Sequence, residues 1–70
     1  MTQKTHNYIP VTIDYQGKQH RGSYYEERGM ITVSSQYGSK TTQIGHSTAE
    51  LLAATMLREL LDEAKHRGEF

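Results

Sequence analysis

"ITVSSQYGSKTTQIG", residues 31–45, has the pattern of two β-strands joined by a tight turn. Its first half alternates apolar with polar side chains, and a period of two is typical of a strand that buries one face. Gly38-Ser39 suits a type II′ hairpin turn, because glycine readily takes the first position of that turn. The cross-strand pairs that this turn predicts are Ser35–Thr42 and Val33–Ile44.

Two more hairpins are predicted upstream of this stretch. Residues 8–15 again alternate, and Pro10 places them in an edge strand, since proline cannot donate to a ladder on both sides. Gln16-Gly17 and Arg28-Gly29 are typical of two-residue hairpin turns. The first turn predicts the pairs Tyr15–Lys18, Ile13–His20, Val11–Gly22 and Ile9–Tyr24. The second turn predicts the pairs Glu27–Met30, Glu26–Ile31, Tyr24–Val33 and Gly22–Ser35.

The three turns, assigned separately, agree on which face of the sheet is apolar. That face carries Ile9, Val11, Ile13, Tyr24, Ile31, Val33 and Ile44. A slip of one residue in any hairpin would send its side chains to the opposite face. The agreement therefore predicts a four-stranded antiparallel meander of order 1-2-3-4. Gly22 lies mid-strand on the apolar face, where we expect it to leave room for the close approach of a helix.

The C-terminal third of the chain has the pattern of a helix with both ends marked. Ser47 is the predicted N-cap, because Glu50 follows it at the capping-box spacing, and Gly68 is the predicted stop. Leu51 points away from the apolar stripe, so we expect either a staple contact with His46 or a contact in a dimer. The stripe contains Ala49, Leu52, Ala53, Met56, Leu57, Leu60, Leu61 and Ala64. It has only the apolar sheet face to cover, which predicts an α+β fold.

Length and composition limit the class of protein. Seventy residues make one domain, predicted over residues 8–70, with residues 1–7 as a loose polar tail. Without cysteine there are no disulfides and no thiolate metal sites. The longest apolar run is too short to cross a bilayer, and the tail lacks the apolar core of a signal peptide, so a cytoplasmic protein is expected. Eight basic residues balance eight acidic ones, which leaves no net field to attract nucleic acid.

No side-chain pattern predicts catalysis. The four histidines are scattered, and none has the spacing of a metal ligand. No nucleophile and base, no carboxylate pair and no phosphate-binding glycine pattern can be recognised from spacing. His20 is predicted to be half-buried at the core margin beside Ile13. We therefore expect a non-catalytic protein with no cofactor and no metal.

The sheet face that the helix leaves open is predicted to be rich in hydroxyls and amides. It contains Tyr8, Thr12, Asp14, Gln19, Arg21, Ser23, Tyr25, Thr32, Ser34, Gln36, Thr41 and Gln43. The simpler interpretation is a solvated face that uses threonine for its β-propensity. The alternative is a recognition surface, in which Tyr8 and Tyr25 form a stacking platform and Arg21 lies between Thr12 and Gln36. The binding residues of that surface would be Tyr8, Thr12, Arg21, Ser23, Tyr25, Thr32, Ser34 and Gln36.

Three segments carry a resemblance to a known class of domain. They are "GKQHRGSYY" (17–25), "MITVSSQYGSKTTQIG" (30–45) and "STAELLAATMLRELL" (47–61). This arrangement resembles the sheet-plus-helix DNA-binding domains of the AP2 type and the arm-binding domains of tyrosine recombinases. The resemblance implies a sheet that enters the major groove and reads bases. By position, the residues in that role would be Arg21, Ser23, Tyr25, Thr32, Ser34 and Gln36.

Two functions are therefore expected for the open face. Charge neutrality, an uncovered face and a small core favour contact with a protein partner or with a second copy, since association would offset marginal stability. The alternative is nucleic-acid binding, which rests on the resemblance and on Arg21, Tyr8, Tyr25, Lys18 and Lys40. A DNA reader needs several cations against phosphate, so local charge separates the two functions.

Overall fold

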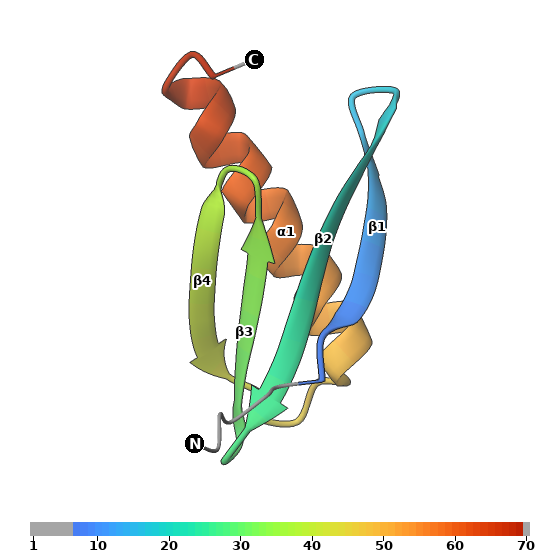
Figure 1. Cartoon of the computed structure of the whole chain (residues 1–70), viewed down its shortest axis with the longest axis vertical. Coiled ribbons are helices and arrows are strands. Elements are labelled where there is room, and N and C mark those ends of the chain that lie inside the picture. The colour runs from blue at the N-terminus through green and yellow to red at the C-terminus, as the bar shows by residue number, and fades with distance from the viewer. Residues whose placement is uncertain (1–6, 70) are drawn as a thin grey trace, which may run out of the picture.

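The computed structural model describes residues 7–69, in which one antiparallel sheet carries a helix on one face (Figure 1). The elements are β1 (Ile9–Tyr15), β2 (Lys18–Glu27), β3 (Met30–Ser35), β4 (Gly38–Gln43) and α1 (Ala49–His66). The order β1-β2-β3-β4 confirms the predicted meander and the α+β class. α1 crosses the sheet diagonally, from β1 towards β4, and no described element covers the opposite face (Figure 1).

The first two hairpins have the predicted turns. Both loop residues have positive φ, 53° and 81° at Gln16-Gly17 and 55° and 75° at Arg28-Gly29. Two positive φ values are characteristic of the type I′ turn, whose twist matches that of the paired strands. The predicted pair Gly22–Ser35 is not formed, because the second ladder stops one pair earlier. The two ladders run from Tyr15–Lys18 to Ile9–Tyr24 and from Glu27–Met30 to Ser23–Ser34.

The predicted register of the third hairpin is wrong. The loop is Gln36-Tyr37 rather than Gly38-Ser39, so Val33 pairs with Lys40 and not with Ile44. The partner of each β3 residue moves by an even number of positions. Every β4 side chain therefore keeps its predicted face, because side chains alternate between faces along a strand.

Side-chain contacts explain why the chain turns earlier than predicted. The Ser35 hydroxyl accepts a hydrogen bond from the Tyr37 N–H at 3.1 Å, which closes a turn mimic around Gln36. The Tyr37 ring packs against the core, and the Arg67 guanidinium donates to the Tyr37 carbonyl oxygen at 3.2 Å. The turn is thus fixed by α1 as well as by its own residues.

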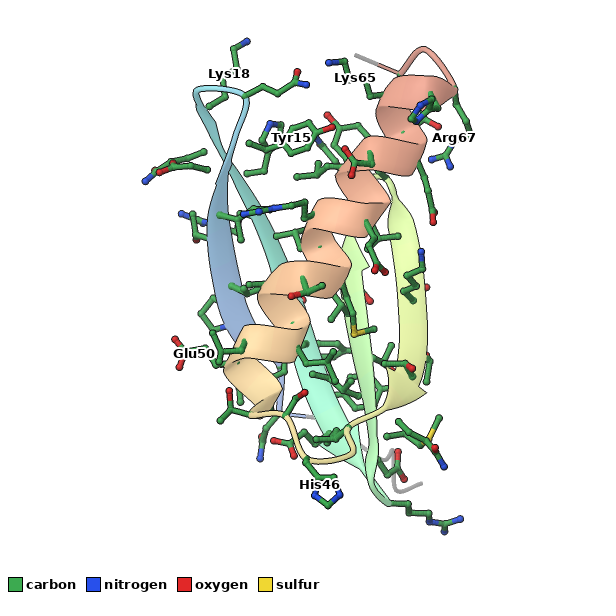
Figure 2. The ribbon with its side chains drawn as sticks, turned by 180° about the vertical axis from the view of Figure 1, so that it is seen from behind. Tyr15, Lys18, His46, Glu50, Lys65 and Arg67 are labelled. Carbon is green, nitrogen blue, oxygen red and sulfur yellow. The ribbon has the colours of Figure 1, made fainter. Side chains whose placement is uncertain are left out.

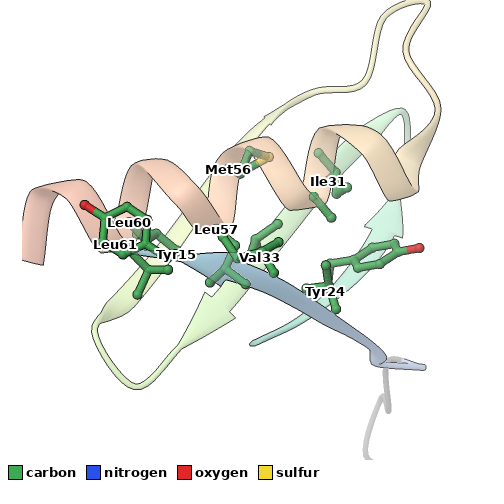
Figure 3. Packing of buried hydrophobic residues seen from close by; sticks show 11 residues of the cluster. Tyr15, Tyr24, Ile31, Val33, Met56, Leu57, Leu60 and Leu61 are labelled. Carbon is green, nitrogen blue, oxygen red and sulfur yellow. The ribbon is translucent and has the colours of Figure 1, made fainter. Parts of the chain in front are cut away.

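The core lies between α1 and the apolar sheet face (Figure 3). Ile31, Val33, Leu57 and Leu61 are fully buried, and Leu57 lies near the middle of the helix. Every predicted stripe residue is buried or half-buried, which confirms the phase of the helix. The buried residues are Val11, Ile13, Tyr15, Tyr24, Ile31, Val33, Ala53, Met56, Leu57, Leu60, Leu61 and Ala64.

The predicted burial of Ile9 and Ile44, the first and last residues of the apolar set, needs correction. Ile9 shares the face of the core residues but is 44% exposed, because it lies at the start of the edge strand. Ile44 lies beyond β4 and is only half-buried against the core. Tyr15 is buried, although the sequence pattern did not include it. Its hydroxyl donates a hydrogen bond to the Asp62 carboxylate and so ties β1 to α1.

Gly22 has the close neighbours expected of it. A Cβ built at this position would lie 3.2 Å from Cδ1 of Leu57 and 2.7 Å from the Ser34 carbonyl oxygen. Real Cβ atoms essentially never approach backbone as closely as the second distance. Glycine therefore allows both α1 and β3 to approach β2 at this point.

The two ends of α1 compare differently with prediction. The N-cap is Thr48 rather than Ser47, and the Thr48 hydroxyl accepts from the Leu51 N–H at 3.3 Å. The C-terminal stop at Gly68 is confirmed, with φ of 80°. The N–H groups of Gly68 and Glu69 donate to Lys65 and Ala64, which is the Schellman pattern.

The predicted tail, residues 1–7, lies outside the described residues except for Asn7. Within the described part of the chain, no helix is long and apolar enough to span a membrane.

Candidate functional site

The open sheet face holds all the predicted binding residues except Gln36. Gln36 lies in the β3–β4 loop and not opposite Arg21, because the chain turns back before it can continue the ladder. Thr12 and Arg21 are direct cross-strand partners, as predicted. The predicted binding residues that lie on this face are Tyr8, Thr12, Arg21, Ser23, Tyr25, Thr32 and Ser34.

An aromatic pair lies on this face near the β2–β3 turn. The rings of Tyr8 and Tyr25 meet edge to face, with centroids 5.2 Å apart and planes at 81°. This is a favoured arrangement, because the positive edge of one ring meets the negative face of the other. Tyr8 is nevertheless 55% exposed, so the pair presents much of its surface to solvent.

A shallow hollow of about 470 Å³ lies on the Tyr8 side of the pair. It forms where the β2–β3 ladder ends, since β2 continues to the tip of its hairpin while β3 has already turned back (Figure 1). Among the described residues that line this hollow, Arg21 is the only charged one. The lining residues are Tyr8, Pro10, Arg21, Gly22, Ser23, Ser34 and Ser35.

A second hollow, of about 420 Å³, lies on the Tyr25 side. Its floor includes Thr32 and Thr41, whose hydroxyl oxygens are 2.9 Å apart across the β3–β4 ladder. Glu27, Arg28 and Met30 complete it. The two tyrosines therefore separate two shallow depressions, each of which has a mixture of apolar, hydroxyl and charged groups.

Among residues 7–69, the charges of the open face balance. Asp14 and Glu27 are acidic, and Arg21 and the loop residue Arg28 are basic. Lys40, which sequence reasoning counted towards a nucleic-acid surface, lies on the helix side of the sheet.

Carboxylates of α1 engage Lys40. Its ammonium binds the Glu63 carboxylate and lies 3.7 Å from that of Glu59. The hydrogen bond to Glu63, reinforced by the charges of both carboxylates, raises the pKa of Lys40 although burial lowers it. Lys18 is at the tip of the β1–β2 hairpin, away from the aromatic pair (Figure 2).

Two titratable residues outside the open face, Tyr15 and His20, pack against each other. Among residues 7–69 no group of three or more His, Asp or Glu side chains could hold a metal ion. His20 is half-buried, as predicted, and its ring meets that of Tyr15 edge to face at 5.9 Å. The hydrogen bond to Asp62, with burial and the carboxylate charge, raises the pKa of Tyr15. The contact between Tyr15 and Asp62 ties β1 to α1 on the helix side of the sheet, opposite the open face.

The sequence predicted which side chains lie on the open face, but it did not predict the two hollows in that face. Pro10 and Met30 line the hollows, yet nothing in the residue types marked them as surface features. The first hollow depends on where β3 ends, which the Tyr37 contact with the core decides. The resemblance to AP2-type domains rests on the sequence alone. No protein-family model, no curated protein and no solved structure matches this chain.

Proposed function

We propose that this chain is a small non-catalytic protein-binding module that docks a protein on its open sheet face. The observation that carries the proposal is the exposed Tyr8–Tyr25 pair between two shallow hollows. Aromatic side chains with a polar rim are typical of the centre of a protein–protein interface. The balanced charge of the surrounding groups is also suited to a protein surface.

The sheet offers this surface in a rigid form. The residues that frame the two tyrosines come from all four strands, which pair in continuous ladders. A docking protein therefore does not have to order the backbone on binding, which reduces the entropic cost of association. The Ser and Thr side chains of this surface are short, so they have little rotamer freedom to lose on binding.

Nucleic-acid binding through the same face is the second candidate. It is favoured by the position of Arg21 beside Tyr8 on the rim of the first hollow, where a base could stack on the ring. The small number of groups that could contact phosphate counts against this function. Lys40 is engaged by two carboxylates, and Asp14 and Glu27 lie on the open face, so the described residues offer few cations that could neutralise a phosphate backbone.

The first test compares three forms of the domain as bait in an extract of the source cells. Tyr25→Ala removes an interface anchor, and Thr55→Ala is the matched control on the exposed outer side of α1. We expect a protein that the parent and Thr55→Ala retain and Tyr25→Ala loses. The purified protein, titrated into the isotope-labelled domain, should then perturb the amide signals of β2 and β3. Signals that change only on the exterior of α1 would refute the proposal.

The second test measures DNA binding directly. A gel shift with random duplex DNA at low salt should show no complex if the face is built for protein. Should a complex form, Arg21→Ala is expected to weaken it and to lower the salt slope by about one unit. That result would favour the second candidate over the first.

A further inference from the structure

β4 leaves one side of its backbone unpaired. It is an edge strand, and within residues 7–69 no other strand pairs with its outer side (Figure 1). In an antiparallel ladder only every second residue turns its N–H and C=O to the neighbouring strand. The Ile44 N–H donates to the Gly29 carbonyl oxygen, in line with the β3–β4 register, so the even-numbered residues of β4 face β3. The backbone groups of Ser39, Thr41 and Gln43 therefore point outward, and all three residues are exposed.

β1, the other edge strand, is protected against pairing. Its ladder closes a two-residue turn at Tyr15–Lys18, so its odd-numbered residues face β2 and Pro10 faces outward. Proline has no N–H to donate, and on an edge strand it prevents the addition of another chain. A groove of about 340 Å³ beside Leu51, the β1–α1 groove, borders this protected edge. β4 contains no proline, so it is the edge that can accept a strand.

A second groove, the β4–α1 groove, adjoins the open edge. α1 crosses the sheet diagonally, so its first half stands away from β4 (Figure 1). The groove has a volume of about 240 Å³. It is lined by residues 40–42 of β4 and by Leu52, Thr55, Met56 and Glu59 of α1. Side chains of an added strand would alternate between the two sides of the sheet, and those opposite Lys40 and Thr42 would reach this groove.

The lining of the β4–α1 groove indicates which side chains fit it. Leu52 and Met56 form an apolar floor towards Thr42. At the other end Lys40 contacts the carboxylate of Glu63 and lies 3.7 Å from that of Glu59. Two carboxylates against one ammonium favour a basic side chain there. The groove therefore suits an apolar and a basic side chain, on alternate residues of one strand.

A second copy of β4 does not meet these requirements. In the antiparallel register with the longest overlap, which centres on Thr41, Lys40 of each copy would lie opposite Thr42 of the other. The apolar floor would then receive an ammonium group, and a threonine would lie beside the carboxylates. The groove thus favours a segment of a different protein.

We propose that β4 is the docking site for an extended segment of a partner protein, which adds a fifth strand to the sheet and places one apolar and one basic side chain in the β4–α1 groove. In strand addition the main-chain hydrogen bonds give affinity, and pockets for alternate side chains give specificity. The site lies at the edge of the sheet, so it is independent of the Tyr8–Tyr25 pair.

Peptide selection tests the proposal on the full chain. Short random peptides displayed on phage are selected against the immobilised protein, and we expect enriched sequences with an apolar residue and a Lys or Arg separated by one position. A synthetic peptide of that sequence should shift the amide signals of β4 and slow hydrogen exchange at Thr41. Selection of no peptide, or of peptides that leave β4 unperturbed, would overturn the proposal.

Thr41 offers a matched pair of variants. Thr41→Pro removes an outward N–H that the β3–β4 ladder does not use, and proline is tolerated at such positions. Thr41→Val keeps the N–H and removes only the hydroxyl that meets Thr32. We expect Thr41→Pro to raise the dissociation constant of the peptide at least about tenfold and Thr41→Val to change it less than about twofold. Equal binding by the two variants would contradict strand addition.

Methylation of the peptide backbone gives a test on the unaltered protein. N-methyl groups on alternate residues, whose N–H groups face β4, should abolish binding, whereas those on the intervening residues should not. Loss of binding without this alternation would refute the proposal. Tyr25→Ala should bind the peptide like the parent; if it alone abolished binding, the peptide would belong to the open face. A doubled mass with slowed exchange at Thr41 before any peptide is added would identify a second copy as the occupant, and this inference would be wrong.

Discussion

Gly22 is the single residue on which the closeness of β2, β3 and α1 depends. Its φ is not positive, so an alanine there meets no backbone strain of its own. The added Cβ would nevertheless lie 2.7 Å from the Ser34 carbonyl oxygen, which belongs to paired backbone and cannot swing away. We expect Gly22→Ala to reduce the free energy of unfolding by about 1–3 kcal/mol, the usual cost of overpacking.

Urea unfolding measures this loss directly, with Ser23→Ala as the control. Ser23 is the next residue of the same strand and faces the open side, so its substitution should change stability by less than about 0.5 kcal/mol. If Gly22→Ala unfolded at the same urea concentration as Ser23→Ala, β3 and α1 would have to be free to shift. The packing of Leu57 against β2 would then be looser than the structure shows.

Tyr15 makes stability depend on alkaline pH. The hydrogen bond to Asp62, burial and the carboxylate charge raise the pKa of Tyr15 above its ordinary value of 10.0. At a pH between the two values the unfolded chain has lost the phenolic proton and the folded chain has kept it, so rising pH favours unfolding. The stabilisation is therefore complete below pH 10.0 and is lost as pH rises through the pKa of the folded state.

Tyr15→Phe should remove this dependence. The variant is expected to be less stable than the parent at neutral pH, because Asp62 loses its donor while the ring still packs. The difference in unfolding free energy between the two should stay constant up to about pH 9 and shrink above about pH 10. Denaturant titrations at a series of pH values give that difference. A gap that stays constant throughout this range would show that the hydroxyl is not held by Asp62 in solution.

At the scale of the element, the start of α1 gives a sharp test. Thr48→Ala removes the side-chain oxygen that accepts from the Leu51 N–H and should cost about 1 kcal/mol. Ser47→Ala one residue earlier should change stability by less than about 0.5 kcal/mol. Thermal unfolding of the two variants beside the parent separates them. The opposite order would place the cap at Ser47, as the capping-box spacing suggested.

The elements that sequence predicted correctly are those fixed by local chemistry. Gln16-Gly17 and Arg28-Gly29 form their turns from their own backbone preferences, and the register of each hairpin follows from the loop. The helical stripe could be phased because eight apolar positions share one spacing. Gly68 ends α1 because the left-handed conformation required there suits glycine.

The elements that sequence misplaced depend on distant contacts. Gly38-Ser39 has turn composition, but the chain turns at Gln36-Tyr37 because Tyr37 packs on the core and accepts from Arg67, thirty residues away. Ser47 and Thr48 are both competent caps, and composition does not choose between them. The candidate site shares this limit. Its side chains follow from alternation, whereas its hollows follow from the point at which β3 leaves β2.

At the scale of the whole molecule, one helix covers one face of the sheet within residues 7–69, and this leaves the open face and the adjoining β1–α1 groove exposed, with Pro10 lining hollows of both. The open face is polar and carries the Tyr8–Tyr25 pair, whereas the β1–α1 groove is lined mainly by apolar side chains and by Glu50. Tyr8 and Ile9 are neighbours in the chain yet lie on the two different surfaces. Substitutions must therefore be chosen by the face of the side chain, since adjacent residues report on different contacts.

Leu57 and Leu51 allow the stability of the whole fold to be tested with one chemical change. Leu57 is fully buried between α1 and the sheet, whereas Leu51, on the same helix, is 68% exposed. Leu57→Ala should cost about 2–5 kcal/mol from lost burial and a cavity. That is comparable with the total stability of a small domain, which lies near the low end of about 5–15 kcal/mol. We therefore expect Leu57→Ala to be largely unfolded at physiological temperature.

Leu51→Ala should lie within about 0.5 kcal/mol of the parent, because the side chain is exposed. Circular dichroism during thermal unfolding compares the three proteins. If Leu57→Ala melted within a few degrees of the parent, α1 would have to pack with a different face on the sheet. Leu51 would then not lie on the exposed side of the helix, and the groove beside it would not form.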